Sequence, residues 1–228
     1  MIKTVLFDLD DTILDFQAAE RTAIRATFDE VGAPSDDATL DRYSEINRAT
    51  WQRLERGELT RCEVLVERFK LLFAELGIDV DPVGTQNIYE HRLSLEHPFI
   101  EGGRELLDAL YGKYALYIAS NGTPLVQDRR IADSGIAHYF DGIFISERIG
   151  ANKPSREFFD AAFAQIDGLS RDETMIVGDS LTSDVLGGIN AGIRTCYFNP
   201  KRRENNTDIT PDYEIRSLSE LPTLLERI

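Results

Sequence analysis

Short apolar runs alternate with segments of helical periodicity over much of this sequence. The runs lie at 4–9, 115–120, 142–145, 174–177 and 195–198, and each ends in a polar or glycine-containing turn. Helical periodicity extends over 103–111, 124–134, 156–165, 183–191 and 219–227. This alternation is typical of βαβ units. We therefore predict an α/β fold, a doubly wound, Rossmann-like parallel sheet covered by helices on both faces.

Residues 16–97 break this alternation. They contain no convincing strand, only amphipathic stretches such as AAERTAIRATFDEVG (18–32) and RCEVLVERFKLLFAELG (61–77), each ending in a glycine suited to a helix C-cap. We predict an inserted α-helical domain over 16–97, within a core domain formed by 1–15 and 98–228. The polar stretch 201–212, KRRENNTDITPD, is predicted to be a surface loop.

The charge balance restricts the possible partners. Forty acidic and 25 basic residues give a net charge of −15 at pH 7, which opposes binding to nucleic acid polymers and to anionic membranes. Cys62 and Cys196 are far apart and lack CxxC spacing, so we expect free thiols in a reducing compartment. We expect no secretory signal and no membrane span, and hence a cytoplasmic location.

Acidic and polar side chains follow several of the predicted strands. Ligands of parallel sheets collect at the carboxyl ends of the strands, so residues at these ends are expected to meet. These residues are Asp8, Asp10, Ser120, Asn121, Lys153, Asp179 and Asp184. Carboxylates this close repel and raise one another's pKa unless a cation intervenes. Mg²⁺ fits aspartates without His or Cys, because it prefers oxygen ligands and keeps positions for waters and substrate phosphate.

Each of these residues also has a purely structural interpretation. Aspartates 8 and 10 could form a turn, as could the Ser-Asn pair at 120–121. The aspartates at 179 and 184 could cap the following helix, and the lysine at 153 could lie on the surface. We expect Asp11 to be a solvated turn residue. The aromatic residues Trp51, Phe69 and Phe73 are predicted to pack inside the helical insertion, because they recur at helical spacing. The three histidines, His91, His97 and His138, have no metal-ligand spacing.

Four short motifs together resemble those of the haloacid-dehalogenase-like phosphohydrolases. They are Asp8-Leu9-Asp10-Asp11-Thr12, Ser120-Asn121-Gly122, Lys153-Pro154, and Gly178-Asp179-Ser180 followed by Asp184. The resemblance extends from residue 8 to residue 184. The helical insertion also resembles the mobile cap that this family carries after its first strand, and we call residues 16–97 the cap.

The resemblance implies a role for each matched residue. Asp8 would be the nucleophile that forms an aspartyl-phosphate, and Asp10 would protonate the leaving oxygen and later activate water. Magnesium would be held by the Asp8 side chain, the Asp10 backbone carbonyl and Asp179, with Asp184 orienting a bound water. The phosphate would be fixed by Thr12, Ser120, Asn121 and Lys153. Physical chemistry supports these roles, because phosphoryl transfer depends mainly on positioning and on charge stabilisation.

The cap sequence narrows the implied substrate. Residues 43–77 are similar to the noncanonical pyrimidine 5′-nucleotidase branch of the family, at positions that include Asn47, Trp51, Gly57, Arg68 and Phe69. The expected substrate is a pyrimidine nucleoside 5′-monophosphate such as dUMP or dTMP, with its base under the cap of a monomer or homodimer.

Alternative functions share the fold or part of the expected chemistry. One alternative is a phosphatase of phosphoglycolate or sugar phosphates, and another is a sugar-phosphate mutase. Haloacid dehalogenases use the same nucleophile but lack an acid at the position of Asp10 and need no metal. A phosphate-sensing binding module, like a receiver domain, holds an aspartyl-phosphate as a signal but has no helical insertion of this size.

Overall fold

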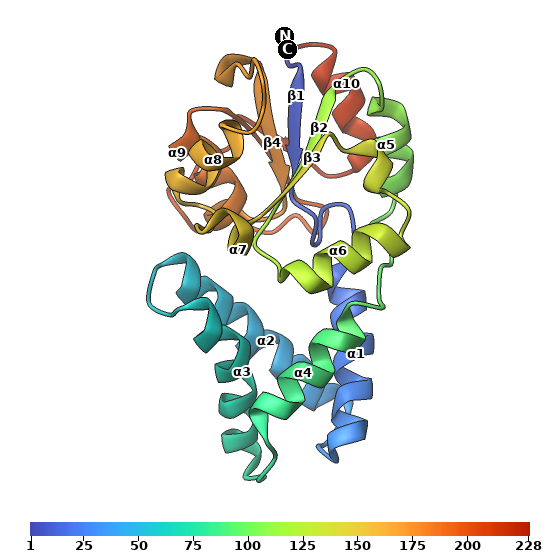
Figure 1. Cartoon of the computed structure of the whole chain (residues 1–228), viewed down its shortest axis with the longest axis vertical. Helices are drawn as coiled ribbons and strands as arrows, with labels where there is room; N and C mark the ends of the chain where they lie inside the picture. The colour runs from blue at the N-terminus through green and yellow to red at the C-terminus, as the bar shows by residue number, and fades with distance from the viewer.

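A six-stranded parallel sheet forms the centre of the molecule in a computed structural model that describes all 228 residues. The strand order is β3-β2-β1-β4-β5-β6, and every pairing is parallel. The strands are β1 (Thr4–Phe7), β2 (Ala115–Ser120), β3 (Gly142–Ile145), β4 (Thr174–Gly178), β5 (Arg194–Phe198) and β6 (Tyr213–Ile215). Helices cover both faces of the sheet (Figure 1), so the doubly wound α/β fold is confirmed.

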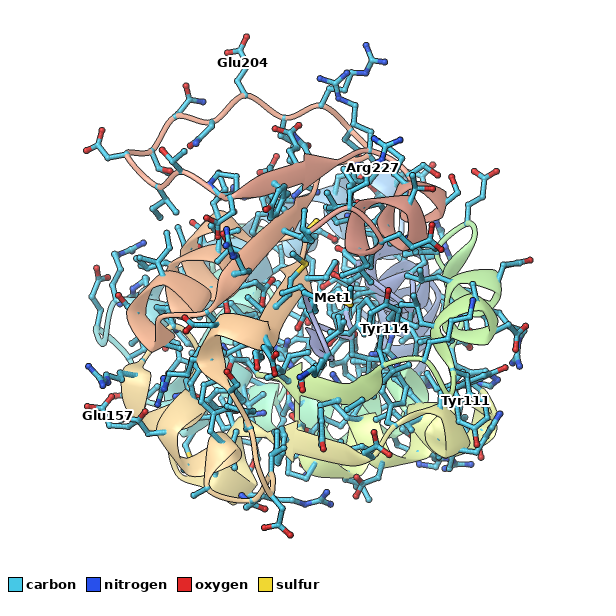
Figure 2. The ribbon with its side chains drawn as sticks, turned by 90° about the horizontal axis from the view of Figure 1, so that it is seen from above. Met1, Tyr111, Tyr114, Glu157, Glu204 and Arg227 are labelled. Carbon is cyan, nitrogen blue, oxygen red and sulfur yellow. The ribbon has the colours of Figure 1, made fainter.

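Five of the six strands coincide with predicted apolar runs to within two residues at either end. The four residues of β1 and the five of β4 are all buried, which explains their continuous apolar sequences. The sixth strand, β6, was not predicted. It has three residues, of which only Ile215 is buried, so it leaves little hydrophobic pattern. The predicted surface loop 201–212 leads into it, and Figure 2 shows Glu204 pointing outward from this loop.

Two hydrophobic clusters attach the core helices to the sheet. One face carries α5 (Gly103–Leu110), α6 (Pro124–Asp133) and α10 (Leu221–Leu225), and the other carries α8 (Arg156–Phe163) and α9 (Leu186–Ala191). A short helix, α7 (Ser146–Ile149), follows β3. The predicted helix over 183–191 differs in detail, because a π-helical turn, Leu181–Val185, precedes α9.

Four helices form the cap: α1 (Phe16–Val31), α2 (Asp37–Glu55), α3 (Arg61–Leu76) and α4 (Pro82–Leu93). The side chains of Asp15, Asp36, Thr60 and Asp81 cap their N-termini. As predicted, α1 and α3 end in glycines with a left-handed backbone. The cap has a hydrophobic cluster of its own, in which the aromatic rings of Phe28, Tyr43, Phe69, Phe73 and Tyr89 pack together.

The chain passes between core and cap at two neighbouring points. Asp15 N donates a hydrogen bond to Pro98 O over 2.8 Å, and Leu14 pairs with Phe99 as an isolated antiparallel bridge. Figure 1 shows the cap at one end of the molecule and both chain termini at the other. We therefore propose the core and cap boundaries at 15/16 and 97/98. None of the helices combines the length and hydropathy that a bilayer crossing requires.

Candidate active site

A cavity of about 210 Å³ is lined by residues of both the core and the cap. Its core side contains seven of the eight residues that the sequence singled out, from the ends of β1, β2 and β4 and from the loop after β3: Asp8, Asp10, Ser120, Asn121, Lys153, Asp179 and Asp184. Thr12, the eighth, is fully buried but does not line the cavity, and its hydroxyl has no hydrogen-bond partner. The structure therefore brings together side chains that are up to 176 residues apart in sequence.

Lys153 lies at the centre of this cluster. Its Nζ is 2.7 Å from Asp8 Oδ1, 2.6 Å from Asp184 Oδ1 and 2.5 Å from Ala119 O, and the residue is 1% exposed. Burial alone would lower the pKa of Lys153, but the neighbouring carboxylates of Asp184 and Asp8 outweigh burial and raise it. Lys153 is thus a charged, fully buried residue, and its interpretation as a surface lysine is wrong.

Three carboxylates of the cluster form a candidate metal site. Asp8, Asp179 and Asp184 each offer one oxygen, and these oxygens all lie within 4.8 Å of one another. Burial raises the pKa of Asp8, and it raises that of Asp179 well above the usual range, while nearby carboxylates act in the same direction. Lys153 pairs with Asp8 and Asp184, and Arg203 Nη1 lies 3.5 Å from Asp179 Oδ2, so two cations face three acids. A hard divalent cation would balance the remaining charge, and the all-oxygen ligand set suits Mg²⁺.

Asp184 is held by the protein through both carboxylate oxygens. Oδ1 accepts from Lys153, and Oδ2 accepts from the backbone N–H of Ser180 over 3.1 Å. A Cβ on Gly178 would lie 2.2 Å from Asp184 Oδ2, so only glycine leaves room for this side chain at the end of β4. Asp184 lies within the π-helical turn, whose N-cap is Ser180. Neither Asp179 nor Asp184 is therefore the N-cap that the alternative interpretation required.

The Ser-Asn-Gly segment connects β2 to the loop of Lys153. Asn121 Oδ1 accepts from Lys153 N, and Asn121 Nδ2 donates to Lys153 O, both over 2.9 Å. Ser120 Oγ accepts from Gly122 N over 3.0 Å, so the turn proposed for this segment is present. Both residues also line the cavity.

Asp11 is a turn residue, as predicted, with φ of 57°, but its side chain is not simply solvated. Its carboxylate accepts from Gln17 N over 3.1 Å and from Gln17 Nε2 over 2.9 Å. Burial raises the pKa of Asp11. The expected solvated aspartate instead joins the first turn of α1 to the segment that carries Asp8.

The Asp10 carboxylate is held by two residues that sequence reasoning missed. It accepts from Gln127 Nε2 over 2.6 Å and forms an ion pair with Arg130 Nη1. Both residues belong to α6, where a spacing of three places them on the same face. A glutamine and an arginine at this spacing, next to buried apolar positions, were the only signal in the sequence that could have found them.

Cap residues complete the cavity. Trp51 is half-buried and lines the cavity, so its predicted place in the cap core is wrong, whereas Phe69 and Phe73 do pack there. Arg61 lies with its guanidinium carbon 5.5 Å from the centre of a Trp51 ring. Arg68 is 3% exposed. Its guanidinium donates hydrogen bonds to two buried side chains, to Asn47 Oδ1 over 2.8 Å and to Gln86 Oε1 over 2.6 Å.

Comparison with known proteins places this geometry in a family. Residues 2–192 match the family model of the haloacid dehalogenase-like hydrolases. A crystal structure of the HAD-hydrolase YfnB of Bacillus subtilis, bound to magnesium, is 41% identical, covers 98% of each chain and has a TM-score of 0.94. The pyrimidine 5′-nucleotidase PynA of Streptococcus pneumoniae is 38% identical over 99% of this chain and 95% of PynA. The pyrimidine 5′-nucleotidase YjjG of Escherichia coli is 31% identical over 97% of this chain and 96% of YjjG.

Proposed function

This chain belongs to the haloacid dehalogenase-like hydrolase family, and from that premise we propose that it is a magnesium-dependent phosphatase of small phosphate monoesters. The observation that carries the proposal is the contact of buried Asp8 with the ammonium group of Lys153, beside Asp179 and Asp184. An aspartate in this position has neighbours that can offset the repulsion between a carboxylate and a phosphate. We place the enzyme in the cytoplasm, as a monomer or homodimer, with no membrane or nucleic acid polymer as a partner.

The first half of the proposed reaction forms an aspartyl-phosphate. An Asp8 carboxylate oxygen attacks phosphorus while the bond from phosphorus to the ester oxygen breaks. The electron pair of that bond goes to the leaving oxygen, which takes a proton from Asp10. Lys153 stabilises the negative charge on the phosphate, and Ser120 and Asn121, which line the cavity, complete its binding site. Thr12, which was expected to bind phosphate too, lies behind the cavity wall. Asp8, the Asp10 carbonyl and Asp179 would hold a magnesium ion, with Asp184 beside it, and the ion would supply additional positive charge near the phosphate.

The second half of the proposed reaction restores the enzyme. Asp10, now a carboxylate, takes a proton from water as the water oxygen attacks phosphorus. The bond between phosphorus and the Asp8 oxygen breaks, and its electron pair returns to Asp8. Inorganic phosphate leaves, and Asp10 holds a proton again for the next cycle.

We further propose a pyrimidine nucleoside 5′-monophosphate, such as dUMP or dTMP, as the substrate. PynA and YjjG, which are named for this activity, match almost the whole chain. On the cap side of the cavity, Trp51 offers an aromatic face against which a base can stack. Arg68 carries hydrogen-bond donors there, and Glu90 lines the same wall with a buried Oε1 that has no partner. The polar edge of a pyrimidine base carries both hydrogen-bond donors and acceptors, which the Glu90 carboxylate and the Arg68 guanidinium can match.

The test is a magnesium-dependent assay of phosphate release from a panel of esters. We expect dUMP or dTMP to be hydrolysed faster than dAMP, dGMP, phosphoglycolate and sugar phosphates. Asp8→Asn should abolish turnover and keep the fold, as judged by circular dichroism, while Asp208→Asn, in an exposed loop, should behave as wild type. Retained activity in purified Asp8→Asn would exclude Asp8 as the nucleophile.

The same assay separates the alternatives. Equal turnover of purine and pyrimidine monophosphates would refute the substrate proposal. Chloride release from a haloacid without Mg²⁺ would indicate a dehalogenase, and transfer of phosphate to a second sugar hydroxyl would indicate a mutase. A stable phosphoprotein without turnover would indicate a phosphate-sensing module.

A further inference from the structure

We propose that Gln127 and Arg130 are positioning residues that orient the Asp10 carboxylate for proton transfer. This inference rests on the proposed function, because the part of Asp10 in the reaction is itself proposed. It adds two residues of α6 that lie outside all four family motifs described above.

The contacts between α6 and Asp10 fix both carboxylate oxygens. Arg130 Nη1 pairs with Asp10 Oδ1, and Gln127 Nε2 donates to Asp10 Oδ2 over 2.6 Å. The two α6 side chains also contact each other, with Arg130 Nη1 donating to Gln127 Oε1 over 3.0 Å. Two donors on separate oxygens, themselves joined by a hydrogen bond, define the plane of the carboxylate as well as its position.

The burial of the three groups fits a positioning role. The Arg130 side chain is 0% exposed, Gln127 is 1% exposed, and the Asp10 side chain is 27% exposed. Asp10 is therefore held from behind by buried donors while part of it remains accessible from the cavity. Ordinary ion pairs lie on the protein surface, where the guanidinium stays in water, so a fully buried guanidinium needs another explanation.

Gly122 provides the space that this arrangement needs. A Cβ at residue 122 would lie 2.2 Å from Gln127 Nε2 and 2.5 Å from its Cδ. The same Nε2 donates to Ser120 Oγ over 2.9 Å. One amide group thus joins Asp10 to the segment proposed to bind phosphate, so that the carboxylate and the phosphate site are positioned relative to each other.

Arg130 also contacts both points where the chain crosses between core and cap. Its Nε donates to Glu96 O over 2.9 Å, and its guanidinium carbon lies 6.0 Å from the centre of the Phe16 ring. The orientation of Asp10 is therefore linked to the two junctions between core and cap. A residue that only stabilised these junctions would make the same contacts, so the test must report on proton transfer itself.

Leaving-group dependence provides such a test. A nucleoside monophosphate leaves as an alkoxide and needs a proton, whereas p-nitrophenolate leaves without one. We would compare dUMP and p-nitrophenyl phosphate by stopped flow in wild type, Arg130→Met and Gln127→Met. The matched control is Arg129→Met, because Arg129 is exposed on the same helix and pairs only with Asp133.

In both α6 variants we expect kcat for dUMP to fall by roughly 10²-fold with little change in KM, the size of effect expected for a misplaced general acid. With p-nitrophenyl phosphate, formation of the aspartyl-phosphate should stay fast and its hydrolysis should slow. The result is a burst of about one p-nitrophenolate per active site, the fingerprint of an accumulating covalent intermediate. In an Asp10→Asn background, Gln127→Met should lower kcat far less than it does alone, because only its hydrogen bond to Ser120 Oγ is then left to lose.

Several outcomes would overturn the inference. Equal losses on both substrates without a burst would assign α6 a structural role only, and unchanged kcat for dUMP in Gln127→Met would exclude positioning. If Arg130→Met does not fold, Gln127→Met decides, because methionine keeps the side-chain length and removes only the amide. If wild type hydrolyses no phosphate ester, the proposed function itself has failed. A working wild type without the predicted variant pattern overturns only this inference.

Discussion

At the scale of single residues, Lys153 determines the charge balance of the site. It is the one cation in contact with Asp8 and Asp184, and all three residues are buried. In Lys153→Met the two carboxylates would lose their cation, so we expect the free energy of unfolding without divalent ions to fall by about 3 to 5 kcal/mol. Urea unfolding in EDTA, followed by circular dichroism, measures this change.

The control for this prediction is Lys113→Met, because Lys113 is an exposed lysine of the core domain. Its free energy of unfolding should stay within about 0.5 kcal/mol of wild type. Similar losses in the two variants would show that the contacts of Lys153 with the acids contribute little to folding.

Residues at strand ends were predictable, and residues that reach the site from a helix face were not. Asp8 and Lys153 meet because parallel strands place their carboxyl ends at one edge of the sheet, and this rule needs no side-chain geometry. The contacts of Gln127 and Arg130 depend on how α6 rotates against the cavity. Trp51 was misplaced for a similar reason, since helical spacing identifies a face but not what that face contacts.

At the scale of elements, the start of α3 joins the cap to the core. Arg61 Nη1 donates to Asn121 O over 2.8 Å and to Ser146 Oγ over 3.2 Å, and Arg61 Nε lies 3.1 Å from Glu147 Oε2. We expect Arg61→Met to weaken the contact between cap and core and to raise KM for dUMP by about tenfold, equivalent to about 1.4 kcal/mol, while kcat changes less. Steady-state kinetics measures both constants.

Arg56→Met is the matched variant, because Arg56 is an exposed arginine of the same turn region whose hydrogen-bonding and ion-pair partner is Glu58. Its KM should equal that of wild type. An unchanged KM in Arg61→Met would mean that these contacts do not influence substrate binding.

The elements themselves were largely predictable, and their irregular ends were not. The left-handed glycines that close α1 and α3 have an unambiguous sequence signal, because glycine adopts this conformation without strain. The π-helical turn before α9 has no such signal. In the structure this turn carries the Asp184 carboxylate, which accepts hydrogen bonds from the distant Lys153 and from the nearby Ser180 N.

At the scale of the whole molecule, cation binding should be coupled to folding. An ion that binds the folded protein alone raises the free energy of unfolding by mass action, by about 2.7 kcal/mol at a free concentration one hundred times its Kd. We therefore expect Mg²⁺ to raise the Tm in a concentration-dependent way, and Asp179→Asn to reduce this rise strongly. Thermal unfolding with a series of Mg²⁺ concentrations tests both expectations.

Asp208→Asn controls for the loss of one negative charge and should respond to Mg²⁺ as wild type does. An equal rise in Asp179→Asn would show that Mg²⁺ stabilises the protein somewhere other than at the acidic cluster.

The fold class followed from the alternation of strands and helices, but the strand order did not. Periodicity identifies which segments are strands and leaves open which pair, so the position of β1 between β2 and β4 is a result of the structure. That position brings Asp8 next to the ends of both neighbours, so the central strand carries the proposed nucleophile.

The paired crossings at Asp15 and Pro98 have a consequence for how such enzymes diversify. Because the two junctions lie side by side, a gene segment that encodes the whole cap can be replaced by another one. Both ends of the new cap then join the core at the same place. Preference for a new ligand can then arise by recombination, while the inherited chemistry below stays intact.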